Sequence, residues 1–188
     1  MKIFISGGCK NGKSYYAQHL AKAQQKANAP LYYVATMRSA DGEDDERIIR
    51  HRREREGWGF LTIEQPFGIE QILQKCDPGG SFLLDSLTAL LANEMFLPDG
   101  NVNENAAEKI ADGLIELMEA VEHIVVVSDY IYSDAYIYDE LTEKYRKSLA
   151  ETDRAAAKAC DVVLEAAYAN VIVHKGKQIF GEIYDKIL

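Results

Sequence analysis

The chain has 188 residues, of which 47% are hydrophobic, and these values are typical of one globular domain with a substantial core. The formal net charge of −9 argues against non-specific binding to nucleic acid or to an anionic membrane, because both need a positive electrostatic field. A small-molecule ligand is therefore the better expectation.

The cysteines Cys9, Cys76 and Cys160 are odd in number and show no C-x-x-C spacing. We therefore expect neither a disulfide framework nor a zinc site, and we expect a reducing compartment, the cytoplasm. No apolar run approaches the roughly 20 residues that span a bilayer, and a strand expected from residue 2 leaves no room for a signal sequence.

The first expected strand, residues 2–6, leads directly into a G-x-x-x-x-G-K-S phosphate loop, and a helix is expected over residues 14–23. The loop glycines allow successive backbone N–H groups to turn toward phosphate oxygens, and the positive end of the following helix points at the same oxygens. Lys13 is expected to reach the β- and γ-phosphates, and Ser14 to ligate Mg²⁺. The pattern predicts a bound nucleoside triphosphate, held by Gly7, Gly8, Cys9, Lys10, Asn11, Gly12, Lys13 and Ser14.

The rest of the chain alternates apolar strand-like runs with helical patterns. Strands are expected at 31–35, 81–85, 123–128, 161–165 and 170–174, and helices at about 42–56, 67–76, 86–96, 104–121 and 138–160. This alternation predicts an α/β fold of the P-loop NTPase type, with a mostly parallel sheet covered by helices on both faces. Residues 1–188 are expected to form a single nucleotide-binding domain.

Two of these strands end in residues that can carry chemistry. Asp85 stands where a P-loop protein places the acidic residue that holds Mg²⁺ through its water shell, although it could instead only cap the helix that begins near Ser86. Ser128 and Asp129 end the run 123–128 in the same way. Because ligands collect at the carboxyl ends of parallel strands, we expect all three side chains to face the same cleft.

The segment 41–56 is acidic at its start and basic toward its end, which complements a helix dipole. One interpretation is a solvated helix with i,i+4 ion pairs such as Glu43 with Arg47. The other is functional, because His51 lies among Arg50, Arg52 and Arg55. Neighbouring cations favour the neutral imidazole, which is the nucleophilic form, and phosphorus is a plausible target.

Five motifs in order and at similar spacing make the chain resemble the bifunctional adenosylcobinamide kinase / adenosylcobinamide-phosphate guanylyltransferases of cobalamin biosynthesis. They are the phosphate loop, Tyr33-Val34-Ala35-Thr36, Arg47-Ile48-x-x-His51-Arg52, Thr62-x-Glu64-x-Pro66, and Asp85-x-Leu87-Thr88 followed by Asn93. The match is specific over residues 1–96. It continues more loosely at Tyr145-Arg146 and at Asp153, where the family usually has Asn.

The resemblance implies two reactions. ATP or GTP phosphorylates adenosylcobinamide, and GTP then guanylylates a histidine, from which GMP passes to the new phosphate to give adenosyl-GDP-cobinamide. By position the guanylylated and catalytic histidine is His51, with Lys13 as the second catalytic residue and Ser14 and Asp85 for Mg²⁺. The resemblance also implies a homotrimer and further nucleotide contacts at Ala35, Thr36, Met37, Arg52, Arg53, Glu64, Asp85 and Glu54.

The segment after the run 123–128 departs from the family pattern. The family's Asn-Glu-Val-Gly-x-Gly-Ile-Val-Pro is replaced by residues 129–137, and Tyr130, Tyr132, Tyr136 and Tyr138 crowd into this stretch. They could form a wall for a flat corrinoid, or they could serve packing or an oligomer contact. The departure leaves two alternatives, a small-molecule kinase without the guanylyltransferase step and a nucleotide-dependent switch protein.

Overall fold

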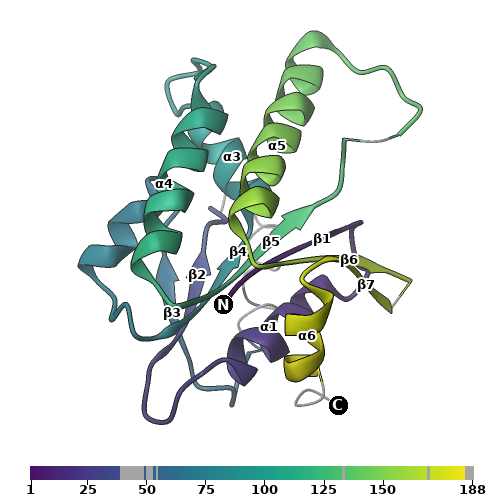
Figure 1. The fold of residues 1–188 in the computed structure, drawn as a ribbon. Coiled ribbons are helices and arrows are strands. Elements are labelled where there is room, and N and C mark those ends of the chain that lie inside the picture. Colours follow the sequence, from purple (N-terminus) through teal and green to yellow (C-terminus); the bar gives the residue numbers. More distant parts are fainter. Residues whose placement is uncertain (39–48, 50–52, 54, 133, 169, 185–188) are drawn as a thin grey trace.

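The computed structural model describes residues 1–38, 49, 53, 55–132, 134–168 and 170–184. Within this part of the chain a seven-stranded sheet has the order β3-β2-β4-β5-β1-β6-β7 (Figure 1). All neighbouring strands pair in parallel except β6 and β7, which pair antiparallel. The strands are β1 (Lys2–Gly7), β2 (Leu31–Ala35), β3 (Phe60–Glu64), β4 (Ser81–Asp85), β5 (His123–Asp129), β6 (Val162–Ala167) and β7 (Asn170–Lys175).

Helices cover both faces of the sheet (Figure 1). They are α1 (Lys13–Ala23), α3 (Leu87–Met95), α4 (Ala106–Ala120), α5 (Glu140–Ala159) and α6 (Lys177–Tyr184), with a 3₁₀ helix, η1 (Ile69–Gln74), between β3 and β4. Successive residues of a strand point to opposite faces, so Phe4 packs into the core beneath α3, α4 and α5, whereas Ile3 and Ile5 pack beneath α1 and α6. The central strands are buried on both sides, and for this reason they read as continuous apolar runs.

The predicted α/β fold with a mostly parallel sheet is confirmed, and so are the strands expected near 31–35, 81–85, 123–128, 161–165 and 170–174. The helix expected over 67–76 is a shorter 3₁₀ helix. Two elements, β3 and α6, were not predicted. β3 lies at the sheet edge with exposed Leu61, Thr62 and Glu64, so it has no continuous apolar run to mark it. Of the helix expected over 42–56, Ile49 and Arg53 are helical, Arg55 and Glu56 lie in a turn, and the other residues lie outside the described part of the chain.

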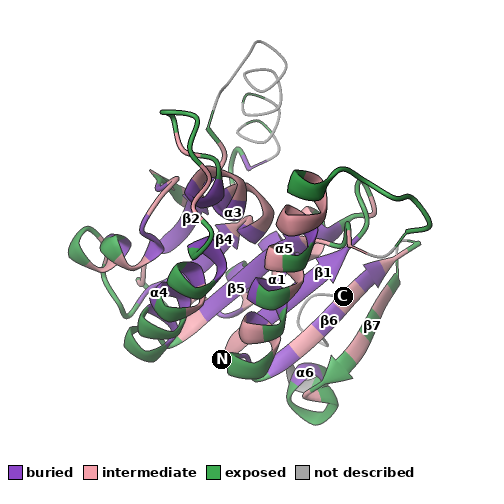
Figure 2. Ribbon diagram, turned by 90° about the horizontal axis from the view of Figure 1, so that it is seen from above, coloured by how far each residue is buried: buried purple, intermediate pink, exposed green. Residues whose placement is uncertain are grey.

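The parallel arrangement brings several strand ends to one edge of the sheet. β5 lies between β1 and β4, and its register places Gly7 opposite Asp129 and Asp85 opposite Val127. Seen from above, the central strands are buried, β7 is mostly exposed, and so is the connection from β5 to α5 (Figure 2). None of the described helices is long and apolar enough to cross a bilayer.

Candidate active site

The phosphate loop connects the end of β1 to the start of α1, as the sequence predicts. Gly12 precedes the helix with φ of 90°, in the left-handed region that favours glycine. Gly7 lies against β6, because a Cβ atom on Gly7 would stand 2.3 Å from the backbone oxygen of Ala166. The Asn11 amide donates a hydrogen bond to that same oxygen. The loop is therefore fixed to the neighbouring strand by backbone packing that any side chain at position 7 would disturb.

Lys13 turns its ammonium group back toward the loop. Its side chain is 7% exposed, and Nζ donates to the backbone oxygen of Gly8 at 2.7 Å and pairs with Asp129 Oδ1 at 2.8 Å. Asp129 is the last residue of β5 and lies directly opposite Gly7 in the parallel register. The end of β5 thus supplies the counter-charge for the phosphate-loop lysine.

The neighbours of Asp129 hold it in this position. Its backbone N–H donates to Thr88 Oγ1 at 2.8 Å, and the N–H of Tyr130 donates to Gly7 O at 2.9 Å. Ser128 is fully buried, so the expectation that both Ser128 and Asp129 face the cleft is wrong for Ser128. The reason is the pleat of the strand, which sends consecutive side chains to opposite faces.

Asp85 ends β4 and accepts a hydrogen bond on Oδ2 from the Tyr33 hydroxyl at 2.6 Å. Helix α3 is capped by the next residue, since Ser86 Oγ accepts from the N–H of Ala89 at 3.3 Å. Asp85 is therefore not the helix cap that the sequence allowed as its alternative role. Its carboxylate stays at the sheet edge, in line with the strand ends around the phosphate loop.

Thr36 joins β2 to the start of α3. It is fully buried, and its hydroxyl both donates to the backbone oxygen of Ser86 at 2.7 Å and accepts from the Ser86 N–H at 2.8 Å. Asn93 Nδ2 donates to Thr36 O at 2.7 Å and to Pro66 O at 3.1 Å. These bonds explain why the motif that contains Thr36 and the motif that contains Asn93 occur together. A nucleotide contact at Ala35, Thr36 or Met37 stays a prediction.

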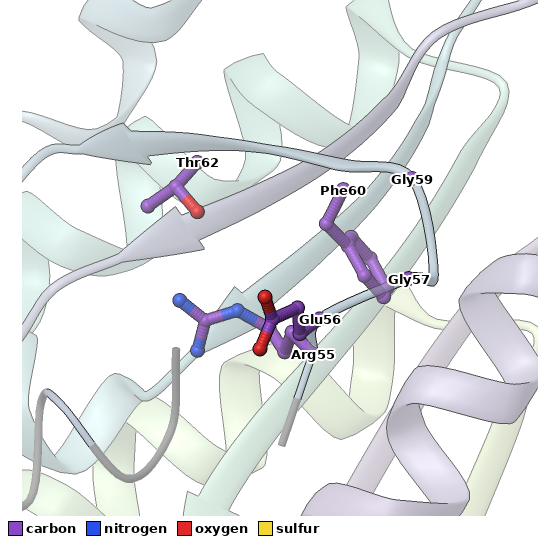
Figure 3. Close-up of a pocket in the computed structure, with 6 residues that line it drawn as sticks. All are labelled: Arg55, Glu56, Gly57, Gly59, Phe60 and Thr62. Carbon is purple, nitrogen blue, oxygen red and sulfur yellow. The ribbon is translucent and has the colours of Figure 1, made fainter. Parts of the chain in front are cut away.

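A cavity of about 440 Å³ opens beside β3, lined by Arg55, Glu56, Gly57, Gly59, Phe60 and Thr62 (Figure 3). The Arg55 guanidinium lies over the Tyr33 ring, with the carbon Cζ 3.5 Å from the ring centroid. Because the hydroxyl of the same tyrosine reaches Asp85, a chain of contacts joins this cavity to the end of β4. The lining of the cavity thus carries one positive side chain, Arg55, and one negative side chain, Glu56.

The residues expected to carry guanylyl transfer lie mainly in the segment before this cavity. His51, Arg52 and Glu54 lie outside the described residues, and Arg53 is an exposed helical residue. Glu64 is an exposed residue of β3 and stands opposite Ala35 in the register. In the sequence, Arg50, Arg52 and Arg53 directly precede Arg55, which is buried and lines the cavity.

The tyrosine-rich segment, residues 129–138, is fastened at its start and exposed at its end. Tyr132 donates from its hydroxyl to Asp153 Oδ2 at 3.2 Å, and its ring lies 4.7 Å from that of Tyr130. By contrast, Tyr136 is 76% exposed and Ile137 is 97% exposed. The packing interpretation is confirmed for Tyr132 only.

Helix α5 supplies the groups that fasten this segment. Arg146 is buried, donates to the backbone oxygen of Ile131 at 3.2 Å, and pairs with Asp134 and Glu143. Asp153, two turns further along the same helix face, is also buried. The pKa of Asp153 is raised to about 7, mainly because the group is buried; the nearby hydroxyls of Ser128 and Tyr132 act in the opposite direction, and the charge of Asp129 adds a smaller increase.

The other three histidines have the packing and surface roles that their sequence positions indicate. His19 lies between the rings of Tyr15 and Trp58, and burial lowers its pKa. His123 and His174 contact the N-terminal amine and Glu165, respectively. All three cysteines are free. Cys9 belongs to the phosphate loop itself, and none of the contacts described above joins His19, His123 or His174 to that loop.

Sequence reasoning missed the roles of Tyr33, Arg55 and Asp153. The roles of Tyr33 and Arg55 left no sign in the sequence, because the two residues contact each other across different segments of the chain. Asp153 could have been found, since the buried α5 residues Arg146, Leu149, Asp153 and Ala156 follow helical spacing and place a carboxylate on the inward face.

The fold and the site together define a P-loop nucleotide-binding protein of the α/β class. The chain matches the family described as cobinamide kinase / cobinamide phosphate guanyltransferase over residues 3–170, and it belongs to that family. Its enzyme class is accordingly transferase, and the resemblance seen in the motifs is confirmed.

Relatives of known name agree with this assignment. The chain is 29% identical over 164 residues to the bifunctional adenosylcobalamin biosynthesis protein CobP of Pseudomonas aeruginosa, covering 87% of this chain and 91% of the relative. It is 24% identical to the corresponding protein CobU of Salmonella typhimurium, covering 87% of this chain and 93% of the relative. The fold is similar to that of the flagellar accessory protein FlaH from Methanocaldococcus jannaschii, with a TM-score of 0.50 at 12% identity, covering 92% of this chain and 77% of that one.

Proposed function

We propose that this protein phosphorylates adenosylcobinamide and then transfers GMP from GTP to the product, with the phosphate loop holding the triphosphate. The observation that carries this proposal is the pairing of Lys13 with Asp129 at the end of β5, beside Asp85 at the end of β4, in a chain of this family. The geometry supports a triphosphate site at the phosphate loop. Membership of the family supports adenosylcobinamide as the acceptor of the transferred groups.

In the first reaction Lys13 would leave Asp129 and Gly8 O for the β- and γ-phosphate oxygens, which offer it a comparable set of oxygen partners. Transfer through a loose transition state needs positioning and charge neutralisation more than a strong base. The backbone N–H groups of the loop and the start of α1 supply both. Lys13 would thus exchange one set of oxygen partners for another, and its positive charge would stay paired with negative charge.

Oxygen ligands fit a magnesium ion at this edge. The Ser14 hydroxyl and the Asp85 carboxylate are the hard donors that Mg²⁺ prefers, and the Tyr33 hydrogen bond orients the carboxylate on one oxygen. When bound, the ion would neutralise charge that builds up on the phosphates. No cluster of three or more His, Cys, Asp or Glu occurs among the described residues, which suits an ion held by few protein groups and by the substrate phosphates.

In the second reaction a nitrogen of His51 would attack the α-phosphorus of GTP, so that a P–N bond forms and pyrophosphate leaves. An oxygen of the cobinamide phosphate would then attack the same phosphorus, forming a P–O bond and releasing His51. Arg52 and Arg53 would neutralise the phosphates during both displacements. The cavity at Arg55 lies next along the chain and offers a cationic wall for the nucleotide.

Incubation with α-labelled GTP tests the histidine step directly. We expect acid-labile, base-stable label on the protein, and we expect His51→Ala to abolish it. His174→Ala is the matched control, because His174 is an exposed histidine that pairs with Glu165 away from the site. Absence of label on the folded wild-type protein, or label that survives His51→Ala, would leave the kinase step as the only activity.

We further infer a homo-oligomer in the cytoplasm. The exposed apolar side chains of Tyr136 and Ile137 support a contact between copies, and three free cysteines suit a reducing compartment. Light scattering of the purified protein at several concentrations should give a mass above 21.1 kDa, the mass of one chain. A concentration-independent mass of one chain would contradict the oligomer.

A further inference from the structure

The carboxyl group of Asp153 is buried on α5 and accepts a hydrogen bond from Tyr132, and the proposed reactions give it no role. It is 3% exposed, Oδ2 accepts from Tyr132, and Oδ1 has no hydrogen-bond partner among the described residues. Leaving one oxygen of a neutral carboxyl group unpaired costs much less free energy than burying an unpaired charge. The surroundings of Asp153 therefore favour the protonated form.

One charged group of the nucleotide site also acts on Asp153, although burial and the hydroxyls of Ser128 and Tyr132 have larger effects on its pKa. Asp129 on β5 raises the pKa of Asp153 through its negative charge, and Asp129 is the partner of Lys13 at 2.8 Å. From the tyrosine-rich segment, Tyr132 faces the same carboxyl group. From α5 itself, Tyr145 has its pKa raised by burial and by both carboxylates. Asp153, Asp129 and Lys13 thus form one electrostatically connected set.

We propose that Asp153 couples proton uptake to nucleotide binding, so that the loaded site keeps Asp153 neutral and an ionised Asp153 weakens the binding of the triphosphate. The proposal rests on the proposed nucleotide site at the phosphate loop. The protonated carboxyl group touches no substrate, so Asp153 is a positioning residue that acts through Asp129 and Lys13.

The physical reason is the redistribution of charge around Lys13 when a triphosphate arrives. In the free protein the ammonium group partly neutralises Asp129. When Lys13 turns to the phosphates, Asp129 loses part of this compensation, and the phosphates add negative charge nearby. Both changes make a second negative charge at Asp153 more costly, and by linkage an ionised Asp153 must lower nucleotide affinity by the same factor.

The pH window follows from the burial of the group. Burial raises the pKa of Asp153 to about 7 from an ordinary value of 3.8, so the folded protein keeps the proton where the unfolded chain has lost it. The free energy of unfolding therefore falls as pH rises from about 4 to about 7, and nucleotide affinity falls as Asp153 ionises above about pH 7.

The test compares wild type, Asp153→Asn and Glu151→Gln by the Kd of a non-hydrolysable GTP analogue between pH 6 and 8.5. Asparagine has the shape of the neutral carboxyl group and is the residue usual in the resembled family. Glu151 is an exposed carboxylate of the same helix, so its variant reports any general charge effect and the titration of the analogue itself.

Between pH 6 and pH 8.5 we expect the Kd of wild type and of Glu151→Gln to rise more than the Kd of Asp153→Asn does. The extra rise should reach up to about tenfold, which corresponds to a change of about one unit in the pKa of Asp153 on binding. Tyr132→Phe should shift the midpoint of the wild-type change to higher pH, because it removes a hydrogen bond that lowers the pKa of Asp153. A structural role alone would change stability without moving this midpoint.

Two contrary results are distinguishable. If Asp153→Asn binds the analogue with the same pH dependence as wild type, or if Tyr132→Phe leaves the midpoint unchanged or lowers it, the inference is refuted while the nucleotide site stands. If the folded wild-type protein does not bind the analogue at any pH, the nucleotide site fails, and the inference fails with it.

Discussion

Lys13 and Asp129 show how single residues prepare this site before a ligand arrives. The ammonium group is almost fully buried, yet it keeps a carboxylate and a backbone oxygen as partners. A buried charge without such partners would be costly, so Asp129 compensates the charge of Lys13 while the ammonium group lies against the loop. The same ion pair supplies the link through which a more distant carboxyl group can influence the nucleotide.

Replacing Lys13 tests its role in phosphoryl transfer. Lys13→Met keeps much of the side-chain length and removes the charge, so kcat for the kinase step should fall by about 100-fold or more, as when other charge-stabilising donors are removed. Steady-state kinetics with adenosylcobinamide and ATP or GTP would measure it. Lys22→Met, on the exposed side of the same helix, should keep the wild-type rate. Equal rates for both variants would show that Lys13 does not contact the phosphates.

Tyr33 illustrates a residue whose role depends on two elements at once. The Tyr33 hydroxyl donates a hydrogen bond to Asp85, and the Arg55 guanidinium packs on the Tyr33 ring. Tyr33 therefore connects the expected magnesium ligand with the cavity beside β3. Tyr33→Phe keeps the ring and removes the hydroxyl. The Mg²⁺ concentration needed for half-maximal kinase rate should rise a few-fold, while stacking of Arg55 is retained. An unchanged Mg²⁺ requirement would argue against Asp85 as a ligand of the ion.

At the scale of elements, the junction of β2, β4 and α3 depends on the buried hydroxyl of Thr36. This hydroxyl satisfies both the N–H and the C=O of Ser86, where α3 begins. The junction fixes the direction in which β4 delivers Asp85 to the site. Hydrogen bonding of one side chain thus determines how two strands and a helix meet.

Thr36→Val should therefore destabilise the protein. It leaves the Ser86 N–H without its partner, whereas the Ser86 carbonyl still accepts from the N–H of Leu90. One unpaired polar group costs about 1–3 kcal/mol, so the free energy of unfolding should fall by about that amount. Thr62→Val, the same substitution at an exposed position of β3, should change it by less than about 0.5 kcal/mol. Urea denaturation of both variants gives the comparison, and similar losses in the two would contradict a special role for Thr36.

The elements that the sequence predicts well are those whose burial is uniform. β4 and β5 are buried on both faces, so their residues form unbroken apolar runs. Among the described strands β3 pairs with β2 alone, and each of its residues is exposed or only partly buried, so β3 lacks the uniform burial of β4 and β5. The phosphate loop was predictable because its chemistry is local, whereas the contact of Arg55 with Tyr33 joins segments 22 positions apart in number and left no local pattern.

At the scale of the whole molecule, a parallel sheet with β5 between β1 and β4 gathers Lys13, Asp129 and Asp85 at one edge. The tyrosine-rich segment extends from the same edge and is fastened to α5 by Arg146 and Tyr132 (Figure 1). Topology could be expected from the alternation of strands and helices. The path of this segment could not, since it lacks the glycines and proline of the family pattern and depends on tertiary contacts with α5.

The central claim is that one P-loop domain carries out both transfers on a corrinoid. Its most direct test is mass spectrometry of adenosylcobinamide after incubation with the purified protein, GTP and Mg²⁺. The products should first show the mass of the phosphorylated compound and then that of adenosyl-GDP-cobinamide, with pyrophosphate released in the second step. Recovery of unchanged adenosylcobinamide from a folded protein that binds GTP would contradict the claim.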